Sequence, residues 1–334
     1  ISLSGGVDST TLYVLLKERL GQKLQPFVYR KSEDLTDESH SAVDLAHRYG
    51  DEPIVVVEPV VQISQILEAS LAKLEYPIWN ISSIAYTSFY SVVSQHGFKV
   101  ILEGHGADEL LGGYPYMLEA AFFDFLRARQ IKDALEIFGL VSRASLPGFS
   151  TLPRSKQAWR YTKNLIRYAC LPSPKPFQET LDFAFERQIL PMVLRTFDRL
   201  SMAHSIESRM PFLDYRFVEF ARSLPIASKV SAGGSKTLLR QILRKYGANE
   251  IADRQLKTGF GSNVSVLMES PELAETLNLY AAATPENLSA WRRKQRTRNS
   301  YTPWKRFQSQ QDAIFVLAAF GFFQRWLLTG NESA

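Results

Sequence analysis

Two glycine-rich segments contain the residues best suited to chemistry. The first opens the chain, ISLSGGVDST, where Ser4, Gly5, Gly6, Asp8 and Ser9 separate an apolar stub from an amphipathic segment. Adjacent glycines at the end of a strand cost backbone entropy and bury nothing, so packing alone does not explain them. They let backbone N–H groups approach an anion, and the positive end of a following helix would point at it. Ser4 and Ser9 add hydroxyl donors.

Asp8 narrows what this segment can bind. A carboxylate repels bare phosphate, but it is a suitable ligand for a Mg²⁺ ion that bridges phosphates. The lysine of the G-x-x-x-x-G-K-[ST] loop is absent, so this is not a loop of that type. The pattern predicts a pyrophosphate cradle; the alternative is a tight strand–helix turn capped by a serine.

The second segment, EGHGADELLGGY, follows the apolar run FKVIL and carries Glu103, Gly104, His105 and Asp108. Ligands of a parallel sheet bind beyond the carboxyl ends of its strands. We therefore expect Asp8 and Asp108 to share one or two magnesium ions above a triphosphate. Either segment alone is weak support for this reading, and the two together are strong support.

The elements that must position these residues alternate between strand-like and helix-like patterns. Strands are expected at Ile1–Leu3, Pro26–Tyr29, Pro53–Val57 and Phe98–Leu102, and helices at Thr10–Leu20, Ser39–Tyr49, Val61–Leu74 and Ser82–Gln95. This alternation predicts an α/β fold with a doubly wound parallel sheet over residues 1–115. Residues 116–334 form a mostly helical portion, with helices expected at Met117–Ile131, Lys132–Val141, Gln178–Ser201, Phe217–Ser223, Lys236–Tyr246 and Ala313–Leu328.

Composition excludes several classes of protein. The net charge of +5 over 334 residues favours anionic ligands such as nucleotides, but it argues against nucleic acid as a partner. Cys170 is the single cysteine, which excludes an internal disulfide and fits a reducing compartment. No signal peptide and no apolar run of about 18 residues is present. We therefore expect a cytoplasmic protein with no membrane segment.

The two glycine-rich segments resemble the synthetase domain of the asparagine synthetase family, within the PP-loop ATP pyrophosphatases. Three further stretches are similar to family blocks: FDRLSMAHSIESRMPFLDYRFVEFARSLP (Phe197–Pro225), GGSKTLLRQIL (Gly233–Leu243) and RQLKTGFG (Arg254–Gly261). Five segments in this order make the resemblance specific. It implies one synthetase domain of PP-loop type, in which residues 1–115 bind ATP and residues 116–334 complete the site.

The resemblance also implies a reaction and its cofactors, ATP and Mg²⁺. A small-molecule carboxylate, aspartate first among the candidates, attacks the α-phosphorus and releases pyrophosphate; ammonia or an amine then displaces AMP. Residues implied in ATP binding are Leu3, Ser4, Gly5, Gly6, Asp8, Ser9, Val28, Glu103 and Gly104, with Asp8 and Asp108 on the metal. Lys236 and Lys257 would offset phosphate charge; the alternative for each lysine is a solvated surface residue.

His105 departs from the family pattern, because asparagine-forming members carry a glutamate there. Some relatives that close rings use a tyrosine paired with a later glutamate, which Glu207 matches. A histidine with a pKa of about 6.5 is suited to deprotonate an amine. A carboxylate partner such as Glu207 would favour and orient its imidazolium. The alternative is that His105 only shapes the pocket for the carboxylate.

The resemblance also implies partners, because members of the family carry a further domain. Its N-terminal glutaminase half begins with a terminal catalytic cysteine, which Cys170, in the proline-bordered stretch YACLPSPKPF, cannot replace. We expect a glutaminase domain or subunit upstream, or another amine source, and a homodimer is left open. Rival functions are a peptide macrocyclase, a β-lactam-type cyclase or a natural-product amidotransferase, and, further away, a PP-loop tRNA-modifying enzyme or a non-catalytic module.

Overall fold

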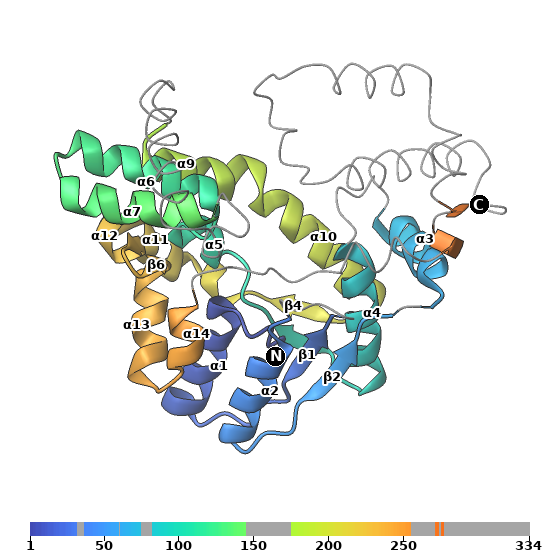
Figure 1. Cartoon of the computed structure of the whole chain (residues 1–334). Helices are drawn as coiled ribbons and strands as arrows, with labels where there is room; N and C mark the ends of the chain where they lie inside the picture. Colours follow the sequence, from blue (N-terminus) through green and yellow to red (C-terminus); the bar gives the residue numbers. More distant parts are fainter. Residues whose placement is uncertain are drawn as a thin grey trace, which may run out of the picture.

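A computed structural model of the chain describes residues 1–31, 37–59, 61–74, 82–144, 175–254, 271–273 and 275–276. The predicted helix Ala313–Leu328 and the predicted site residue Lys257 lie outside these ranges. The described part is a mixed α/β structure in which helices predominate (Figure 1). None of its helices is long and apolar enough to cross a membrane.

Short parallel strands form the centre of the α/β part. Strand β1 (Phe27–Arg30) pairs with β2 (Ile54–Val57), and β3 (Val100–Leu102) pairs with β4 (Glu207–Arg209). Residues 1–3 link the two pairs, because the backbone N–H of Leu3 donates to Phe27 O and that of Ser2 donates to Leu102 O, each at 2.9 Å. Strand β4 corrects the sequence analysis, which expected no strand there. A three-residue strand is too short to give an alternating pattern.

Two hydrophobic clusters cover opposite faces of these strands. Phe27 and Tyr29 on β1 pack into a cluster with helices α3 (Ile63–Leu74), α4 (Ser82–Gln95) and α10 (Leu190–Ala203). Val28, between them, points to the other face and packs with helices α1 (Val7–Leu20), α2 (Ser39–Arg48), α13 (Thr237–Lys245) and α14 (Asn249–Asp253). Side chains that alternate in this way are expected of strands buried on both faces. Figure 1 shows the same division, with α13 and α14 beside α1 and with α3 and α4 at the other end of the strands.

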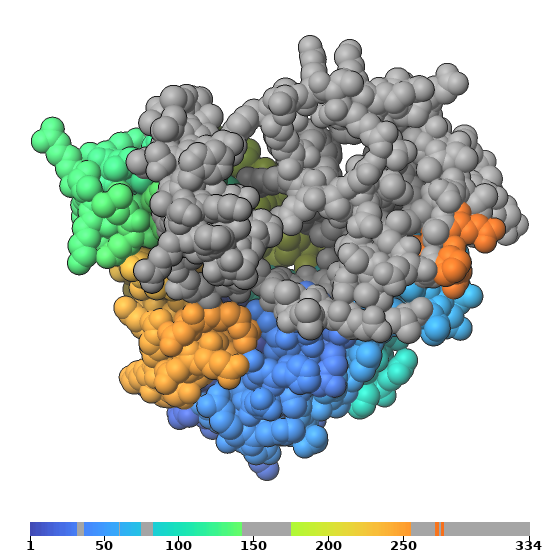
Figure 2. Space-filling view, in the orientation of Figure 1, coloured from blue at the N-terminus to red at the C-terminus, as the bar shows by residue number. Residues whose placement is uncertain are grey.

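The remaining elements extend the helical part. They are α5 (Ala107–Leu111), α6 (Pro115–Arg127), α7 (Ile131–Ala144), α9 (Phe177–Phe183), the π-helical turn η2 (Ala184–Gln188), the 3₁₀ turn η3 (Pro211–Leu213), α11 (Tyr215–Ser223), α12 (Ile226–Lys229) and the short antiparallel strands β5 (Val230–Ser231) and β6 (Gly234–Ser235). A third hydrophobic cluster joins α6, α7 and α9. In Figure 2 the orange surface of α13 and α14 lies directly against the blue surface of the first 60 residues.

Several predicted helix boundaries differ from the structure, and two of the differences are larger than the rest. Helix α1 begins at Val7 instead of Thr10, because Gly6 takes an extended conformation as its N-cap and the turn at Asp8 is already helical. The single helix predicted at Gln178–Ser201 is divided into α9, η2 and α10. Pro191 stands in the first turn of α10, where its missing N–H costs no hydrogen bond. The earlier start of α1 matters for the site, because it points the helix N-terminus directly at the glycine loop.

Candidate active site

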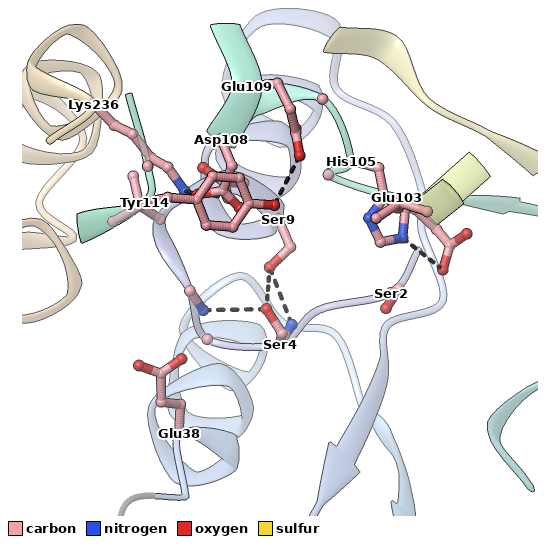
Figure 3. Close-up of a pocket in the computed structure, with 18 of the residues that line it drawn as sticks. Ser2, Ser4, Ser9, Glu38, Glu103, His105, Asp108, Glu109, Tyr114 and Lys236 are labelled. Atoms are coloured by element: carbon pink, nitrogen blue, oxygen red, sulfur yellow. Dashed lines mark hydrogen bonds and ion pairs between the residues drawn. The ribbon is translucent and has the colours of Figure 1, made fainter. Parts of the chain in front are cut away.

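A cavity of about 390 Å³ lies beyond the carboxyl ends of the strands. Both glycine-rich segments line it, as do side chains from α4, α10 and the loop before α13. Figure 3 shows its two sides: Lys236, Asp108 and Tyr114 lie on one, and His105 and Glu103 lie on the other, with Ser9 between them. Glu38, Ile251 and Arg254 line it as well, so the structure brings together residues from seven separate segments of the sequence.

The first loop holds its shape through its own serines. Ser4 Oγ and Ser9 Oγ are 2.9 Å apart, Ser9 Oγ accepts from the Ser4 N–H at 3.1 Å, and Ser4 Oγ accepts from the Gly6 N–H. Gly5 has φ +77, and a Cβ there would lie 2.4 Å from the carbonyl oxygen of Glu38. Only glycine fits that position. The result is a tight loop ahead of the α1 N-terminus, the arrangement suited to an anion.

Lys236 connects this loop to the second segment. Its Nζ lies 2.5 Å from Asp8 Oδ2 and 2.7 Å from Asp108 Oδ1, so one ammonium joins two carboxylates that are far apart in the sequence. Lys236 is only 4% exposed and takes a left-handed φ of +59 at the N-cap of α13. Gly113 makes room for this cluster, since a Cβ there would lie 1.7 Å from Asp108 Oδ1.

Electrostatics keep Lys236 charged. Burial acts to lower its pKa, but the charges and hydrogen bonds of Asp108 and Asp8 outweigh burial and raise the pKa above its ordinary value. An ammonium at this position shows that the two carboxylates favour a cation between them. Within the described residues no group of three or more His, Cys, Asp or Glu side chains forms a metal cage. Two carboxylates completed by substrate phosphates are, however, the usual set for Mg²⁺, so the residues fit that ion.

The opposite side of the cavity contains the buried carboxylate of Glu103. Glu103, 3% exposed, accepts hydrogen bonds from Tyr90 Oη at 3.0 and 2.9 Å and from Ser208 Oγ. His105 Nε2 lies 3.9 Å from Glu103 Oε1, and the imidazole rests against Phe197 with ring centroids 3.8 Å apart. Burial first, then the charge of Glu103, raises the pKa of Tyr90 well above 10, so Tyr90 stays a neutral donor.

Three predicted site residues are not where the sequence analysis expected them. Glu207 starts β4 opposite Val100, so it lies at the end of the strands away from the cavity. Its carboxylate accepts from Arg209 Nε at 2.8 Å, and that ion pair lowers its pKa. The expected pairing of Glu207 with His105 is therefore wrong. Leu3 and Val28 are fully buried in the core and do not line the cavity.

The other predicted residues of the described part do line the cavity: Ser4, Gly5, Gly6, Asp8, Ser9, Glu103, Gly104, His105, Asp108 and Lys236. Their roles stay predictions. Two polar pairs were missed. Tyr114 donates to Glu109 at 2.7 Å, and Arg254, which begins the RQLKTGFG stretch, pairs with Glu38 at 3.0 Å and donates to the Gly5 carbonyl. Tyr114 and Glu109 stand inside the second glycine-rich segment, which was the available signal.

A family sequence model, Asparagine synthase, matches residues 1–327. The chain belongs to the asparagine synthase family. It is 28% identical over 252 residues to a glutamine-hydrolyzing asparagine synthetase of Bos taurus, covering 72% of this chain and 35% of that protein. It is 28% identical over 177 residues to glutamine-hydrolyzing asparagine synthetase 3 of Bacillus subtilis, covering 47% and 26%. It is also 22% identical over 330 residues to the amidase chyE of Penicillium rubens, covering 78% and 49%.

Membership in the family confirms the resemblance stated from the five sequence segments. The chain spans about half, or less, of the length of the curated relatives it matches. The family model matches residues 1–327, and that range includes every residue that lines the cavity.

Proposed function

We propose that the chain is an ATP-dependent amide-forming ligase that adenylates a carboxylate, releases pyrophosphate, and passes the acyl group to ammonia or an amine. The observation that carries the proposal is the cluster of Asp8, Asp108 and Lys236 beside the serine–glycine loop. The fold is proposed to be the doubly wound PP-loop type, supported by the helices on both faces of the strands. Residues 1–115 and 116–334 then act as one unit, because Asp8 and Lys236 come from different parts.

The chain's own residues would bind and orient the triphosphate. The N–H groups of the first loop and the α1 N-terminus face the anion, and Ser4 and Ser9 add hydroxyl donors. Asp8 and Asp108 would hold Mg²⁺, which when bound neutralises the β- and γ-phosphates and stabilises pyrophosphate as the leaving group. Lys236, whose ammonium lies between the two carboxylates, would supply positive charge beside the phosphates in the transition state. Lys257 is proposed to assist from outside the described residues.

The acyl group would be delivered on the other side of the cavity. Aspartate is the first candidate for the carboxylate, with the product asparagine, and the cavity also presents His105 to the incoming amine. The nitrogen donor is proposed to be ammonia, free or supplied by a glutaminase domain or subunit; the names of two relatives state that they hydrolyse glutamine. A cytoplasmic location fits the use of ATP, and a homodimer stays open.

ATP–pyrophosphate exchange tests the proposal. The protein is mixed with ATP, Mg²⁺, labelled pyrophosphate and L-aspartate, and asparagine and AMP are measured separately after ammonium chloride is added. We expect aspartate-dependent exchange, and AMP in equal amount to asparagine. Asp108→Ala, which loses one carboxylate of the cluster, serves as the blank. ATP binding without exchange for any carboxylate would contradict an adenylating function.

A second candidate is a specialised ligase that makes a different amide. The wall beside His105 consists of Tyr86, Phe197 and Val193, and the rings of Tyr86 and Phe197 are 4.0 Å apart. An aromatic wall suits a larger, less polar carboxylate than aspartate. Exchange that depends on an aryl or alkyl carboxylic acid, and not on aspartate, would favour this candidate.

A further inference from the structure

We propose that Glu103 positions His105 as the acceptor of the proton that the attacking amine loses, so that the two residues act as a pair within one loop. The inference rests on the proposed function and names the group that carries out its second half-reaction. The sequence analysis assigned Glu103 to ATP binding and gave His105 a different partner, Glu207. The structure separates Glu207 from the cavity and brings Glu103 to the imidazole instead.

The surroundings of Glu103 fix its carboxylate in one orientation. Tyr90 reaches both oxygens from α4, and Ser208 donates to Oε2 from β4, so donors from two different elements hold the group. A buried carboxylate that accepts several hydrogen bonds does not rotate freely. Oε1 is thereby presented to His105 Nε2. Phe197 lies against the imidazole and limits where the ring can lie.

The separation of 3.9 Å between Nε2 and Oε1 is an ion-pair distance and not a full hydrogen bond. Catalytic contacts are often this long in an unliganded site and shorten in the complex. Both residues line the cavity, but His105 is about one-fifth exposed whereas Glu103 is buried, so the imidazole is the more accessible of the two groups. This arrangement is the one expected when a carboxylate orients a base.

The electrostatic surroundings support the same roles. Lys236 is engaged with Asp8 and Asp108 on the other side of the cavity (Figure 3). Around His105, its own loop contributes the Glu103 charge, β4 contributes the Ser208 hydroxyl, and α10 contributes the Phe197 ring. Helix α4 contributes the neutral phenols of Tyr90 and Tyr86, whose pKa values burial and then Glu103 raise.

In the proposed second half-reaction, the acyl group passes from the acyl-adenylate to the amine. The amine nitrogen attacks the carbonyl carbon of the acyl-adenylate, and a new C–N bond forms. One N–H proton passes to Nδ1 of neutral His105, while Nε2–H points at Glu103, so the imidazolium is stabilised by the carboxylate. The C–O bond to AMP then breaks and AMP leaves with the electron pair. The imidazolium afterwards returns its proton to water.

A titration of the five histidines by NMR tests the pairing without any substrate. In protein labelled with ¹³C- and ¹⁵N-histidine, His105 is assigned by comparison with His105→Gln. Glu103→Gln keeps the shape of the side chain and removes its charge, so the midpoint of the His105 titration should move to lower pH. Glu207→Gln is the matched control and should leave that midpoint in place. A midpoint unchanged by Glu103→Gln would overturn the proposal.

Kinetics test the role. With L-aspartate, ATP and ammonium chloride, Glu103→Gln should keep ATP–pyrophosphate exchange within about threefold and lower amide formation by roughly 10²-fold, the usual contribution of a general base. Equal loss of both steps would mean that Glu103 serves ATP binding, and would overturn the inference. Lack of exchange with any carboxylate in the unmodified protein would refute the proposed function. The NMR titration uses no substrate, so it tests the pairing of Glu103 and His105 independently of that function. If Glu103→Gln does not fold, Ser208→Ala, which removes one donor to the carboxylate, should give the same separation of the two steps to a smaller degree.

Discussion

Two lysines are buried in different regions of the molecule, and their surroundings are opposite. Lys236, in the cavity, lies between the carboxylates of Asp8 and Asp108. Lys229, at the end of α12 in the helical part, is 1% exposed and its Nζ donates to the amide oxygen of Gln178 at 2.7 Å. Both ammonium groups have lost water. Only Lys236 has two carboxylates within ion-pair distance.

The difference separates the effect of burial from the effect of charge. At Lys229 burial dominates and lowers the pKa to about 8, with Asp182 opposing it and Arg222 adding to it. At Lys236 burial acts in the same direction, but Asp108 and Asp8 reverse the outcome. The two carboxylates therefore favour the charged form of Lys236, whereas burial favours the neutral form of Lys229. Lys229 is close to neutral at mildly alkaline pH, as suits a structural residue.

Removal of the Lys236 charge has the largest expected effect. Lys236→Met leaves two partly buried carboxylates facing each other, and breaking a buried ion pair in this way costs at most about 3–5 kcal/mol. Urea unfolding should show that loss in the free energy of unfolding, and aspartate-dependent ATP–pyrophosphate exchange should disappear. The control is Lys245→Met on the exposed face of the same helix, which should change the free energy of unfolding by less than about 0.5 kcal/mol.

A double substitution distinguishes charge from packing at this site. Asp108→Asn together with Lys236→Met removes one carboxylate along with the ammonium, so the free energy of unfolding should recover in part. Exchange should stay absent, because both substitutions affect the proposed site. Full stability in Lys236→Met alone would contradict the ion pairs as described.

The lowered pKa of Lys229 should make the free energy of unfolding depend on pH in the alkaline range. Its pKa is about 8 in the folded chain and about 10.4 in the unfolded chain. Between these values the unfolded state binds more protons, so the free energy of unfolding should rise with pH over that interval. Lys229→Met should lack this rise. Urea titrations of both proteins at intervals between about pH 8 and 10 measure the difference; parallel curves would contradict it. Tyrosines also titrate at alkaline pH, but both proteins contain the same tyrosines. Their contribution therefore cancels when the two curves are subtracted.

The sequence was sufficient to predict that the two glycine-rich segments line one cavity, while their proposed role toward phosphates stays a prediction. Each of the two segments places glycines and an aspartate, Asp8 or Asp108, directly after an apolar run. This pattern indicates a loop whose geometry depends on neighbouring residues alone. The lysine of the SKT segment could be added only by resemblance, because 228 residues separate it from Asp8. The strand-and-helix order of the first half was predictable for the same local reasons.

The other side of the cavity was not predictable, because it depends on register. Strand β4 has three residues, and its pairing with β3 sets Glu207 opposite Val100 and Ser208 opposite Ile101. A shift of one position would exchange the residue that faces Glu103. No pattern in the sequence fixes that register. Glu207 was taken as the partner of His105 by resemblance to relatives that close rings, and Glu103 was assigned to ATP binding alone. Lys229 was missed too, because burial of a lysine leaves no local signal.

A single substitution would make Lys229 resemble Lys236. Gln178→Glu places a carboxylate where the amide oxygen now lies 2.7 Å from Nζ, which favours the ammonium. The alkaline rise in stability should then shrink or vanish. The free energy of unfolding at pH 7 should change by no more than about 1 kcal/mol, because desolvation of the new charge offsets the attraction. Asp182, which now accepts from Gln178 at 3.1 Å, would also be repelled. The control, Gln241→Glu, adds the same charge at an exposed position of α13 and should leave the alkaline rise in stability intact. If the rise persists in Gln178→Glu, burial alone, and not the missing carboxylate, accounts for the difference in pKa between the two lysines.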